Sequence, residues 1–265
     1  MTPLALGFSN RFRFAQTMTW IVCALLMLPI VIVVVVSFGQ SSFMAFPPTS
    51  LSTRWYVQFF DSPEWMSALF TSFLIAVMAS AIATLLGFFG AWSLVRGQFG
   101  RKKLIISFCL LPLIVPTVIT SVALYFASAP LELVGSKAWI AVCHASLALP
   151  IVLLILISSL QGIDPSIERA AAGLGASGAG ILFTVVLPMA APGIVSATFF
   201  SFLTSFDELI VSMFLSGLTT ETLPVRIWNS LTMNMEPVIA AISSFLIVLT
   251  VALLLFESLV RKMRT

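Results

Sequence analysis

Six long apolar stretches, almost free of charged side chains, make up most of this chain. An α-helix rises about 1.5 Å per residue, so about 20 residues are enough to cross the roughly 30 Å hydrocarbon core of a bilayer. A helix also pairs its backbone N–H and C=O groups within the segment, as lipid requires. The stretches therefore predict six transmembrane helices in an all-α fold. They cover residues 18–38, 66–95, 104–127, 138–160, 193–215 and 238–256.

The composition excludes a water-soluble protein. Of the 265 residues, 60% are hydrophobic and only 9% are charged, whereas a soluble domain carries roughly 25% charged residues. The polar side chains are too few to cover so much apolar material, so most of the surface faces lipid. We expect residues 1–265 to form a single transmembrane domain, and nothing in the sequence suggests nucleic-acid binding.

Few side chains in the apolar stretches carry chemistry. Cys23, Cys109 and Cys143 form no CxxC pair or Cys/His cluster, which predicts buried thiols and no metal site. His144 is the only histidine, and a hydrogen bond between helices is favoured for it over a proton relay. A membrane-embedded enzyme needs several such groups at one depth, so we expect no catalytic residue and no cofactor in this chain.

Two further expectations concern the third and the last stretch. Pro112 and Pro116 lie inside the third stretch, and prolines within a helix predict a kink. Glu257 and Arg261 are four residues apart near the end of the last stretch. That spacing predicts an ion pair on one face of the helix.

Positive charges are distributed unequally between the two sides of the predicted helices. With an even number of spans, both chain ends lie on one side, and ten Lys and Arg residues fall there against three on the other. Because Lys and Arg are enriched in cytoplasmic segments, we predict that both termini are cytoplasmic. The ten are Arg11, Arg13, Arg96, Arg101, Lys102, Lys103, Arg169, Arg261, Lys262 and Arg264, and the three are Arg54, Lys137 and Arg226.

The second predicted cytoplasmic loop, residues 161–192, is the most informative segment between helices. Asp164 followed by Pro165 predicts the start of a short helix, because aspartate caps helix N-termini and proline suits the first helical position. Small residues follow, and Gly173 and Gly175 suit the end of this helix. A docking element for another protein and an ordinary connecting helix are both consistent with these residues.

The same loop resembles the EAA loop of permeases from bacterial ABC importers. The family pattern is E-A-A, three residues, G, nine residues, then I-x-L-P. In this chain Arg169 occupies the glutamate position, with Glu168 one residue earlier, and Val185 replaces the isoleucine. The resemblance implies that the loop 164–188 couples this chain to a separate ATPase. The coupling residues implied are Glu168, Arg169, Ala170, Ala171, Gly175, Leu187 and Pro188, and Leu187-Pro188 is also expected to redirect the chain into the fifth span.

The resemblance extends from about residue 18 to 260. Residues 52–56, 205–209, 222–225 and 235–237 are similar to the spermidine/putrescine branch, in particular to the second permease of such systems. This implies a type I ABC importer permease (MetI-like) fold, crossing the bacterial cytoplasmic (inner) membrane several times. It also implies a paralogous permease as partner in a heterodimer, two ATP-binding subunits that hold ATP and Mg²⁺, and an external substrate-binding protein. The chain has no P-loop of its own, so ATP hydrolysis is expected in the partner.

Asp207 and Glu208 are the acidic residues well inside an apolar stretch. Counted from Gly193, they lie roughly 21 Å into the core, where an ionised carboxylate is costly and normally faces a bundle interior or a wet cavity. One of them is therefore a candidate for lining the pathway of a cationic cargo. Two alternatives remain open. The acids are a structural pair bonded to neighbouring helices, or the fifth helix ends early and both lie near the outer interface.

The cargo implied by the resemblance is a polyamine such as putrescine or spermidine. Related permease branches carry ferric iron, thiamine, phosphonates or opine-like compounds, so the same role with another cargo is the first alternative. The second is a secondary transporter driven by an ion gradient through Asp207, Glu208 or His144. Such a transporter would usually show internal repeats or paired broken helices, and no repeat is visible in the sequence.

Overall fold

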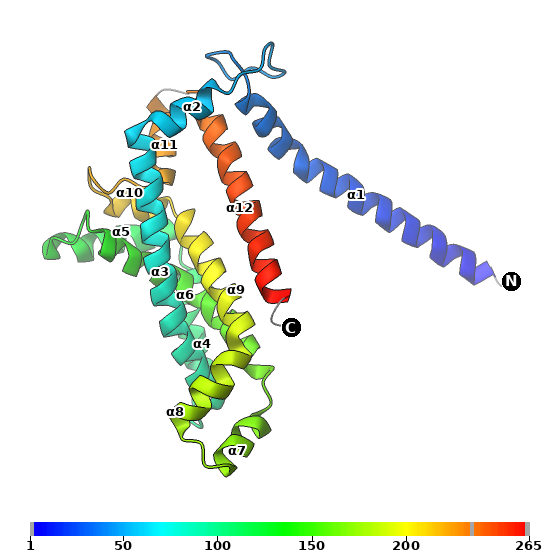
Figure 1. Cartoon of the computed structure of the whole chain (residues 1–265), viewed down its shortest axis with the longest axis vertical. Helices are drawn as coiled ribbons and strands as arrows, with labels where there is room; N and C mark the ends of the chain where they lie inside the picture. The colour runs from blue at the N-terminus through cyan, green and yellow to red at the C-terminus, as the bar shows by residue number, and fades with distance from the viewer. Residues whose placement is uncertain (1–2, 234–235, 263–265) are drawn as a thin grey trace. The chain divides into compact units, whose positions relative to one another are not determined.

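The computed structural model describes residues 3–233 and 236–262, and most of these residues are helical (Figure 1). The one backbone bridge outside helices among them is antiparallel and joins Gly39 to Leu51. The all-α prediction is therefore confirmed. The backbone forms two compact units, which comprise Met1–Ser62 with Ser230–Thr250 and Pro63–Asn229 with Val251–Thr265.

The first unit begins with one long apolar helix, α1 (Pro3–Ser37). Its part Phe14–Ser37 is long and apolar enough to cross a membrane, which agrees with the first predicted span. The short helix α2 (Arg54–Asp61) follows and buries Trp55 and Phe59. The unit therefore combines one candidate span with a small aromatic core.

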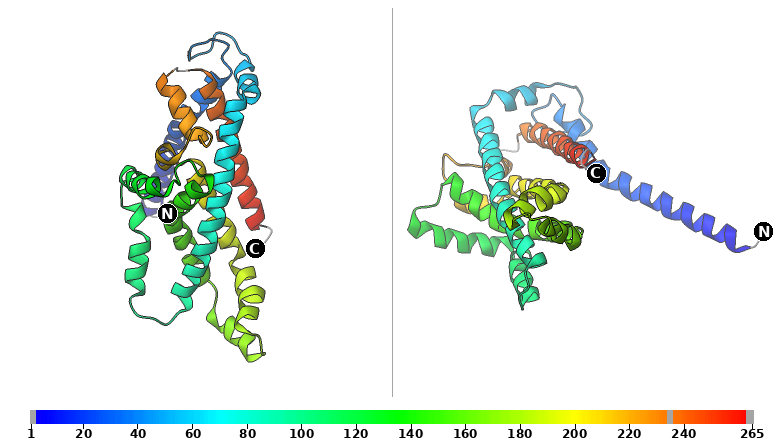
Figure 2. Two further views of the ribbon diagram at one scale, coloured as in Figure 1. Left: turned by 90° about the vertical axis from the view of Figure 1, so that its left-hand side faces the viewer. Right: turned by 60° about the horizontal axis from the view of Figure 1, so that its bottom comes forward.

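Three helices of the second unit pack side by side, and the views in Figures 1 and 2 agree on this arrangement. They are α3 (Pro63–Arg96), α6 (Lys137–Gln161) and α9 (Leu187–Phe206). Small side chains allow helix backbones to approach closely, and close packing replaces the hydrophobic driving force that lipid does not supply. Small buried residues at helical spacing line α3, namely Ala68, Ser72, Ala76, Ala79, Ala83, Gly87 and Ala91.

Two glycines mark the closest approaches between these helices. A Cβ atom on Gly87 would lie 2.4 Å from Cγ1 of Val152, and a Cβ atom on Gly193 would lie 2.2 Å from Oγ of Ser159. Non-bonded carbon atoms favour separations of about 3.5–4.0 Å. The packing of α6 against α3 and α9 therefore requires glycine at both positions.

Replacing Gly87 with Val should lower the thermal stability of the assembled complex, because Val152 is fully buried and cannot move away. Overpacking of this kind costs about 1–3 kcal/mol, whereas the helix propensities of Gly and Val differ by less than about 0.5 kcal/mol. Thermal melting in detergent would measure the effect. Gly100→Val is the control, because a Cβ at Gly100 meets nothing within 4 Å; equal melting temperatures for the two variants would contradict the packing argument.

The third apolar stretch is sharply bent. α4 (Lys102–Cys109) and a 3-10 turn lead to Pro116, after which α5 (Thr117–Ser128) begins. The two parts, Lys102–Leu113 and Thr117–Leu131, meet at 93°. Proline lacks a backbone N–H and disfavours helical geometry in the residue before it, so a straight helix cannot continue through Pro116. The predicted kink is confirmed, and it divides the stretch into two helices.

The fifth helix begins and ends earlier than predicted. Helical turns run from Gly178 to Phe206 without the redirection that was expected at Leu187-Pro188. A proline ring clashes with the carbonyl four residues earlier in a regular α-helix. Here a π-helical turn at Leu182–Val186 ends two residues before Pro188. A π turn changes the backbone pairing at that point, which lets the helix continue. The predicted limits 193–215 are thus corrected to 178–206.

Four helices among the described residues are long and apolar enough to cross a membrane, and the bent third stretch adds a fifth if its parts form one span. The helices α3 and α6 match two predicted spans to within three residues at each end. The last helix, α12 (Val238–Lys262), contributes a shorter apolar part, Val238–Ala252. The remaining helices are η1 (Leu111–Leu113), η2 (Ala129–Leu131), α7 (Pro165–Gly173), α8 (Gly178–Ile181), η3 (Leu182–Val186), α10 (Ile210–Leu215) and α11 (Leu223–Met233).

The prediction of three buried thiols is correct for only one of them. Cys143 is buried, whereas Cys23 is exposed and Cys109 is partly exposed. The reason is that α4 has no buried residue and the apolar window of α1 is entirely exposed. Apolar surroundings in the sequence therefore do not distinguish burial in protein from exposure to lipid.

Candidate coupling loop and interrupted helix

The helix predicted in the loop is α7, and it starts at the predicted cap. The Asp164 carboxylate accepts a hydrogen bond from the Ser166 backbone N–H at 2.8 Å, and Pro165 is the first helical residue. Hydrogen bonds from the Ser166 backbone and side chain lower the pKa of Asp164 below its ordinary value. The cap therefore stabilises the helix above the ordinary aspartate pKa and is lost as the pH falls through the lowered one.

The helix ends at Gly173 and is closed by a glycine in the left-handed conformation two residues later. Gly175 has a φ of +89°, and its N–H donates to the Ala172 carbonyl at 3.0 Å. The Ala176 N–H donates to the Ala171 carbonyl at 3.1 Å. This pair of hydrogen bonds is the Schellman motif, in which glycine is favoured because it has no Cβ. Both predicted glycines therefore lie at the helix end, because Gly173 is the last helical residue and Gly175 closes the turn that follows it.

One arginine fastens α7 to the end of α3. Nη2 of Arg96 lies 2.7 Å from the Glu168 carboxylate and donates to the Ile163 carbonyl at 2.9 Å. The Arg96 and Glu168 side chains are only 19% and 18% exposed, so solvent screens the pair less than a surface ion pair. Glu168, one residue before the glutamate position of the EAA pattern, therefore makes an internal contact, and Arg169 stays exposed.

The surface of α7 that remains open combines small, apolar and cationic side chains. Ala170 and Arg169 are exposed, and the apolar Ile167 and Leu174 are 40% and 90% exposed. At the other end of the loop, Pro188 is exposed and Leu187 is partly buried. The predicted coupling residues thus divide into internal anchors, such as Glu168, and exposed positions.

If the loop couples this chain to an ATPase, as its resemblance to the EAA loop implies, breaking the Arg96–Glu168 pair should reduce ATP-coupled uptake several-fold, because α7 would lose its attachment to α3. A hydrogen bond between charged groups contributes about 1.5–3 kcal/mol. We expect Glu168→Gln and Arg96→Glu to impair uptake and the exchange Arg96→Glu/Glu168→Arg to restore part of it, since the Ile163 contact is not rebuilt. Lys103→Gln, which changes an exposed cation, is the control. Failure of the exchange to restore any uptake would contradict the anchoring role.

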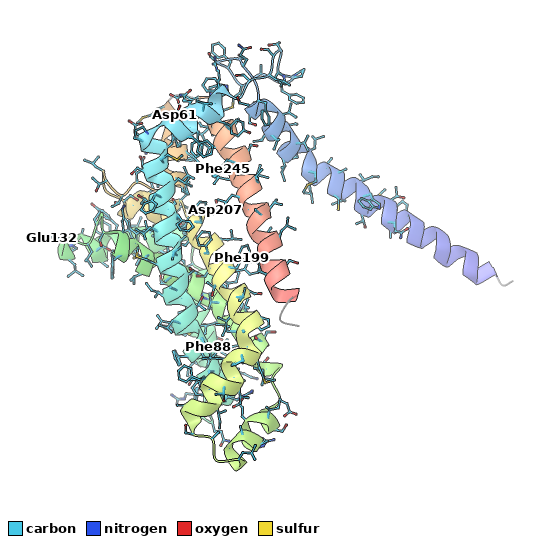
Figure 3. The ribbon with its side chains drawn as sticks, viewed as in Figure 1. Asp61, Phe88, Glu132, Phe199, Asp207 and Phe245 are labelled. Atoms are coloured by element: carbon cyan, nitrogen blue, oxygen red, sulfur yellow. The ribbon has the colours of Figure 1, made fainter. Side chains whose placement is uncertain are left out.

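The two acids predicted in the fifth span lie where its helix is interrupted. α9 ends at Phe206, and α10 begins at Ile210. The Glu208 carboxylate accepts hydrogen bonds from the backbone N–H groups of Ile210 and Val211, both at 3.0 Å. Asp207 is exposed at the end of α9 (Figure 3). Its carboxylate makes no hydrogen bond or ion pair with the described residues. The fifth helix therefore ends early, as one of the alternatives supposed, while the position of the two acids near the outer interface stays a prediction.

His144 lies beside this interruption. Its Nδ1 is 2.9 Å from Oγ of Ser205 on α9, and its Nε2 is 3.1 Å from Oγ of Ser212 on α10. The predicted imidazole hydrogen-bonded between helices is confirmed. The sequence did not indicate the partners, which are 61 and 68 residues away along the chain.

Residues 83–265 match the model of the family described as "binding-protein-dependent transport system inner membrane component". This chain belongs to that family. The spermidine/putrescine transport system permease protein PotC of Haemophilus influenzae is 31% identical over 96% of this chain and 98% of its own length. PotC of Escherichia coli K12 is 28% identical over 91% of both chains, and the putrescine transport system permease protein PotI of the same strain is 33% identical over 83% of this chain and 80% of its own.

Solved structures support the fold of this permease. A bacterial ABC transporter involved in the import of alginate matches with a TM-score of 0.71 at 13% identity, covering 99% of this chain and 98% of that one. An amino acid ABC transporter with histidines matches with a TM-score of 0.59 at 21% identity, covering 81% and 99%. At these identities the likeness concerns the fold alone, and it confirms the ABC importer permease architecture.

An ionic cluster at the start of α3 was not predicted from the sequence. The Arg226 guanidinium pairs with Glu64 and, at 3.1 Å, with Glu221, and it lies 5.0 Å from the ring centre of Trp65. Asn229 donates to the other Glu221 oxygen at 2.8 Å. From the sequence, Arg226 was predicted only as a charge on the outer side. Glu64 is 162 residues away along the chain, and the five-residue separation from Glu221 is not a helical pair spacing, so spacing did not reveal the cluster.

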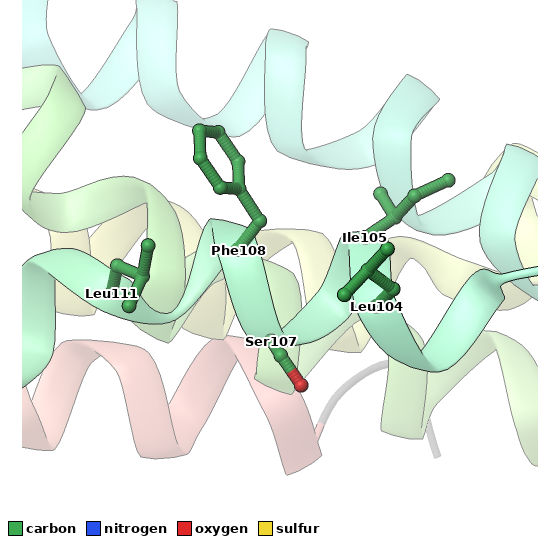
Figure 4. A pocket seen from close by; sticks show the side chains of 5 residues that line it. All are labelled: Leu104, Ile105, Ser107, Phe108 and Leu111. Atoms are coloured by element: carbon green, nitrogen blue, oxygen red, sulfur yellow. The ribbon is translucent and has the colours of Figure 1, made fainter.

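Cavities also lie beside the helices in the described part of the permease, and two of them bear on the predictions. One, of about 490 Å³, is lined by Leu104, Ile105, Ser107, Phe108 and Leu111 of the α4 region (Figure 4) and is almost purely apolar. The other, of about 690 Å³, lies beside Glu257, whose carboxylate accepts a 2.6 Å hydrogen bond from Ser196 on α9. The predicted partner of Glu257 was Arg261, whose side chain lies outside the described residues.

Proposed function

We propose that this chain is a permease subunit of an ATP-driven bacterial importer of polyamines in the cytoplasmic membrane. Its partners would be a paralogous permease, two ATP-binding subunits and an external binding protein. One observation carries the cargo assignment. The similarity to a permease named for spermidine and putrescine extends over 96% of this chain, beyond the part that matches the family model.

The loop 164–188 is the proposed coupling element, and ATP hydrolysis would occur in the subunit that it contacts. The support is mechanical. The helix α7 is capped at Asp164, closed at Gly175 and fastened to α3 by Arg96. A short helix held in this way keeps its shape when a partner pushes on its open surface, and the push passes to the long helices as rigid bodies.

Asp207 is the proposed pathway acid, in preference to Glu208. The Glu208 carboxylate is occupied by two backbone N–H groups of α10, whereas Asp207 is an exposed residue whose carboxylate has no hydrogen-bond partner among the described residues. A cation pathway needs a carboxylate that is available to the cargo, yet one that binds weakly enough to release it. Asp207 meets both requirements, because a single exposed carboxylate attracts a polyamine without enclosing it.

The proposed topology has six spans, both termini in the cytoplasm and one transmembrane domain. The four candidate spans, the bent third stretch and the apolar part of α12 supply the six segments. The excess of Lys and Arg on the side of the chain ends supports the orientation. Thiol labelling of single cysteines placed at Gly100 and Leu218 would test it, since the two residues are expected on opposite sides.

ATP-dependent uptake in proteoliposomes tests the proposed function. The chain would be purified with the products of neighbouring permease, ATPase and binding-protein genes, and offered radiolabelled putrescine and spermidine. We expect uptake that requires both ATP and the binding protein. Uptake of another ligand of the binding protein, without polyamines, would overturn the cargo assignment and keep the permease role. Transport by the purified chain alone on an ion gradient would overturn both.

A further inference from the structure

His144 is almost fully enclosed by protein at the interruption between α9 and α10. Its side chain is 1% exposed, and its two serine partners, Ser205 and Ser212, are 4% and 0% exposed. Both ring nitrogens are engaged, at 2.9 and 3.1 Å. A serine hydroxyl can donate or accept, so either neutral tautomer of the ring satisfies both contacts.

The two serines lie on opposite sides of the interruption. Ser205 is in the last turn of α9, and Ser212 is in the first turn of α10. One imidazole on α6 therefore fastens both ends of the broken helix to a single point. A hydrogen bond between two helices usually joins one point on each helix. Here the imidazole fixes both ends of the segment between Ser205 and Ser212 relative to each other.

The interruption has two supports, and neither of them is Asp207. The Glu208 carboxylate caps the free N–H groups of α10, and His144 holds the flanking turns. The Asp207 N–H donates to the Leu203 carbonyl at 3.1 Å, so Asp207 continues the last turn of α9. His144 holds that turn through Ser205.

We propose that His144 is a positioning residue that keeps the interrupted segment in the form that presents the Asp207 carboxylate to the cargo. The proposal rests on the pathway role proposed above for Asp207. His144 acts through Asp207 and does not touch the cargo, because the ring is buried and both nitrogens are occupied.

Pairwise substitution tests this relationship, with ATP-dependent spermidine uptake by the reconstituted complex as the measurement. We expect His144→Leu to lower uptake about fivefold and Asp207→Asn about tenfold. The double variant should be no worse than Asp207→Asn, because residues that act through one group are not additive. His144→Gln, whose amide also donates and accepts, should restore most of the uptake. If the loss of uptake in the double variant equals the product of the two single losses, the positioning role would be overturned.

Two further variants keep the test decisive if His144→Leu fails to assemble. Ser212→Ala removes one of the two contacts with little change in volume. Combined with Asp207→Asn, it should lower uptake no further than Asp207→Asn does alone. Ser146→Ala is the matched control on α6, because the Ser146 hydroxyl donates only to the Cys143 carbonyl of its own helix. Normal uptake in Asp207→Asn would overturn the pathway role and the positioning role together. If Asp207→Asn lowers uptake and Ser212→Ala lowers it further by the same factor in the double variant, the positioning role alone would be overturned.

Discussion

Replacing Gly175 with Leu should lower polyamine uptake about tenfold while ATP hydrolysis by the assembled complex continues. Gly175 has a φ of +89°, and a bulky residue held there costs about 1–3 kcal/mol. The equilibrium between the closed and the open form of the Schellman turn would shift toward the open form about tenfold, since about 1.4 kcal/mol corresponds to a tenfold change in an equilibrium. A Cβ at this position meets nothing within 4 Å inside the chain, so the core of the permease should remain intact.

Gly175→Asn is the matched control, because asparagine tolerates the left-handed conformation far better than leucine. Uptake and ATP hydrolysis would be measured on the same proteoliposomes, so that their ratio reports coupling. We expect the ratio to fall for Gly175→Leu and to change little for Gly175→Asn. Normal coupling in the leucine variant, with all subunits present, would refute the proposed role of the loop.

Replacing Asp207 with Asn should reduce uptake of spermidine about tenfold without affecting assembly. The substitution removes a negative charge and keeps the shape of the side chain. The loss corresponds to about 1.4 kcal/mol of attraction to a polyvalent cation, well below the several kcal/mol of an unscreened pair at contact, as suits an exposed carboxylate. The effect should shrink at high ionic strength, because salt screens an exposed charge.

Glu208→Gln separates the two neighbouring acids. The amide oxygen of glutamine can still accept from the Ile210 and Val211 N–H groups, so the start of α10 should be preserved and uptake should stay near normal. A normal Asp207→Asn variant beside an impaired Glu208→Gln variant would reverse the assignment. Equal loss in both would indicate that the pair acts on structure and not on the cargo.

Local features of the candidate site were predictable from the sequence. The Asp164 cap and the glycine at the end of α7 each depend on residues within a few positions, where side-chain type and backbone preference act directly. The limits of α3 and α6 could also be predicted from the sequence, because the length of an apolar segment must match the bilayer whatever the segment packs against.

Contacts between distant parts of the chain were not predictable in this way. Arg96 and Glu168 are 72 residues apart, and the sequence offered two neighbouring charges, Glu168 and Arg169, without indicating which one points inward. The interruption after Phe206 was one of several alternatives that the sequence left open, because hydropathy does not distinguish a continuous from a broken apolar segment. It became visible only with the cap from Glu208 and the bonds from His144.

The sequence by itself determined that this is a membrane protein of helical spans with a capped helix in one loop, while the permease role came from its resemblance to a family. Those features depend on composition, segment length and short-range spacing. Only the tertiary structure decided which acid stays free, where the fifth helix ends, and which side chain anchors the loop. Each of these depends on the pairing of buried polar groups across helices. Such groups must find partners in a medium without water, and the partner is set by the packing of the helices.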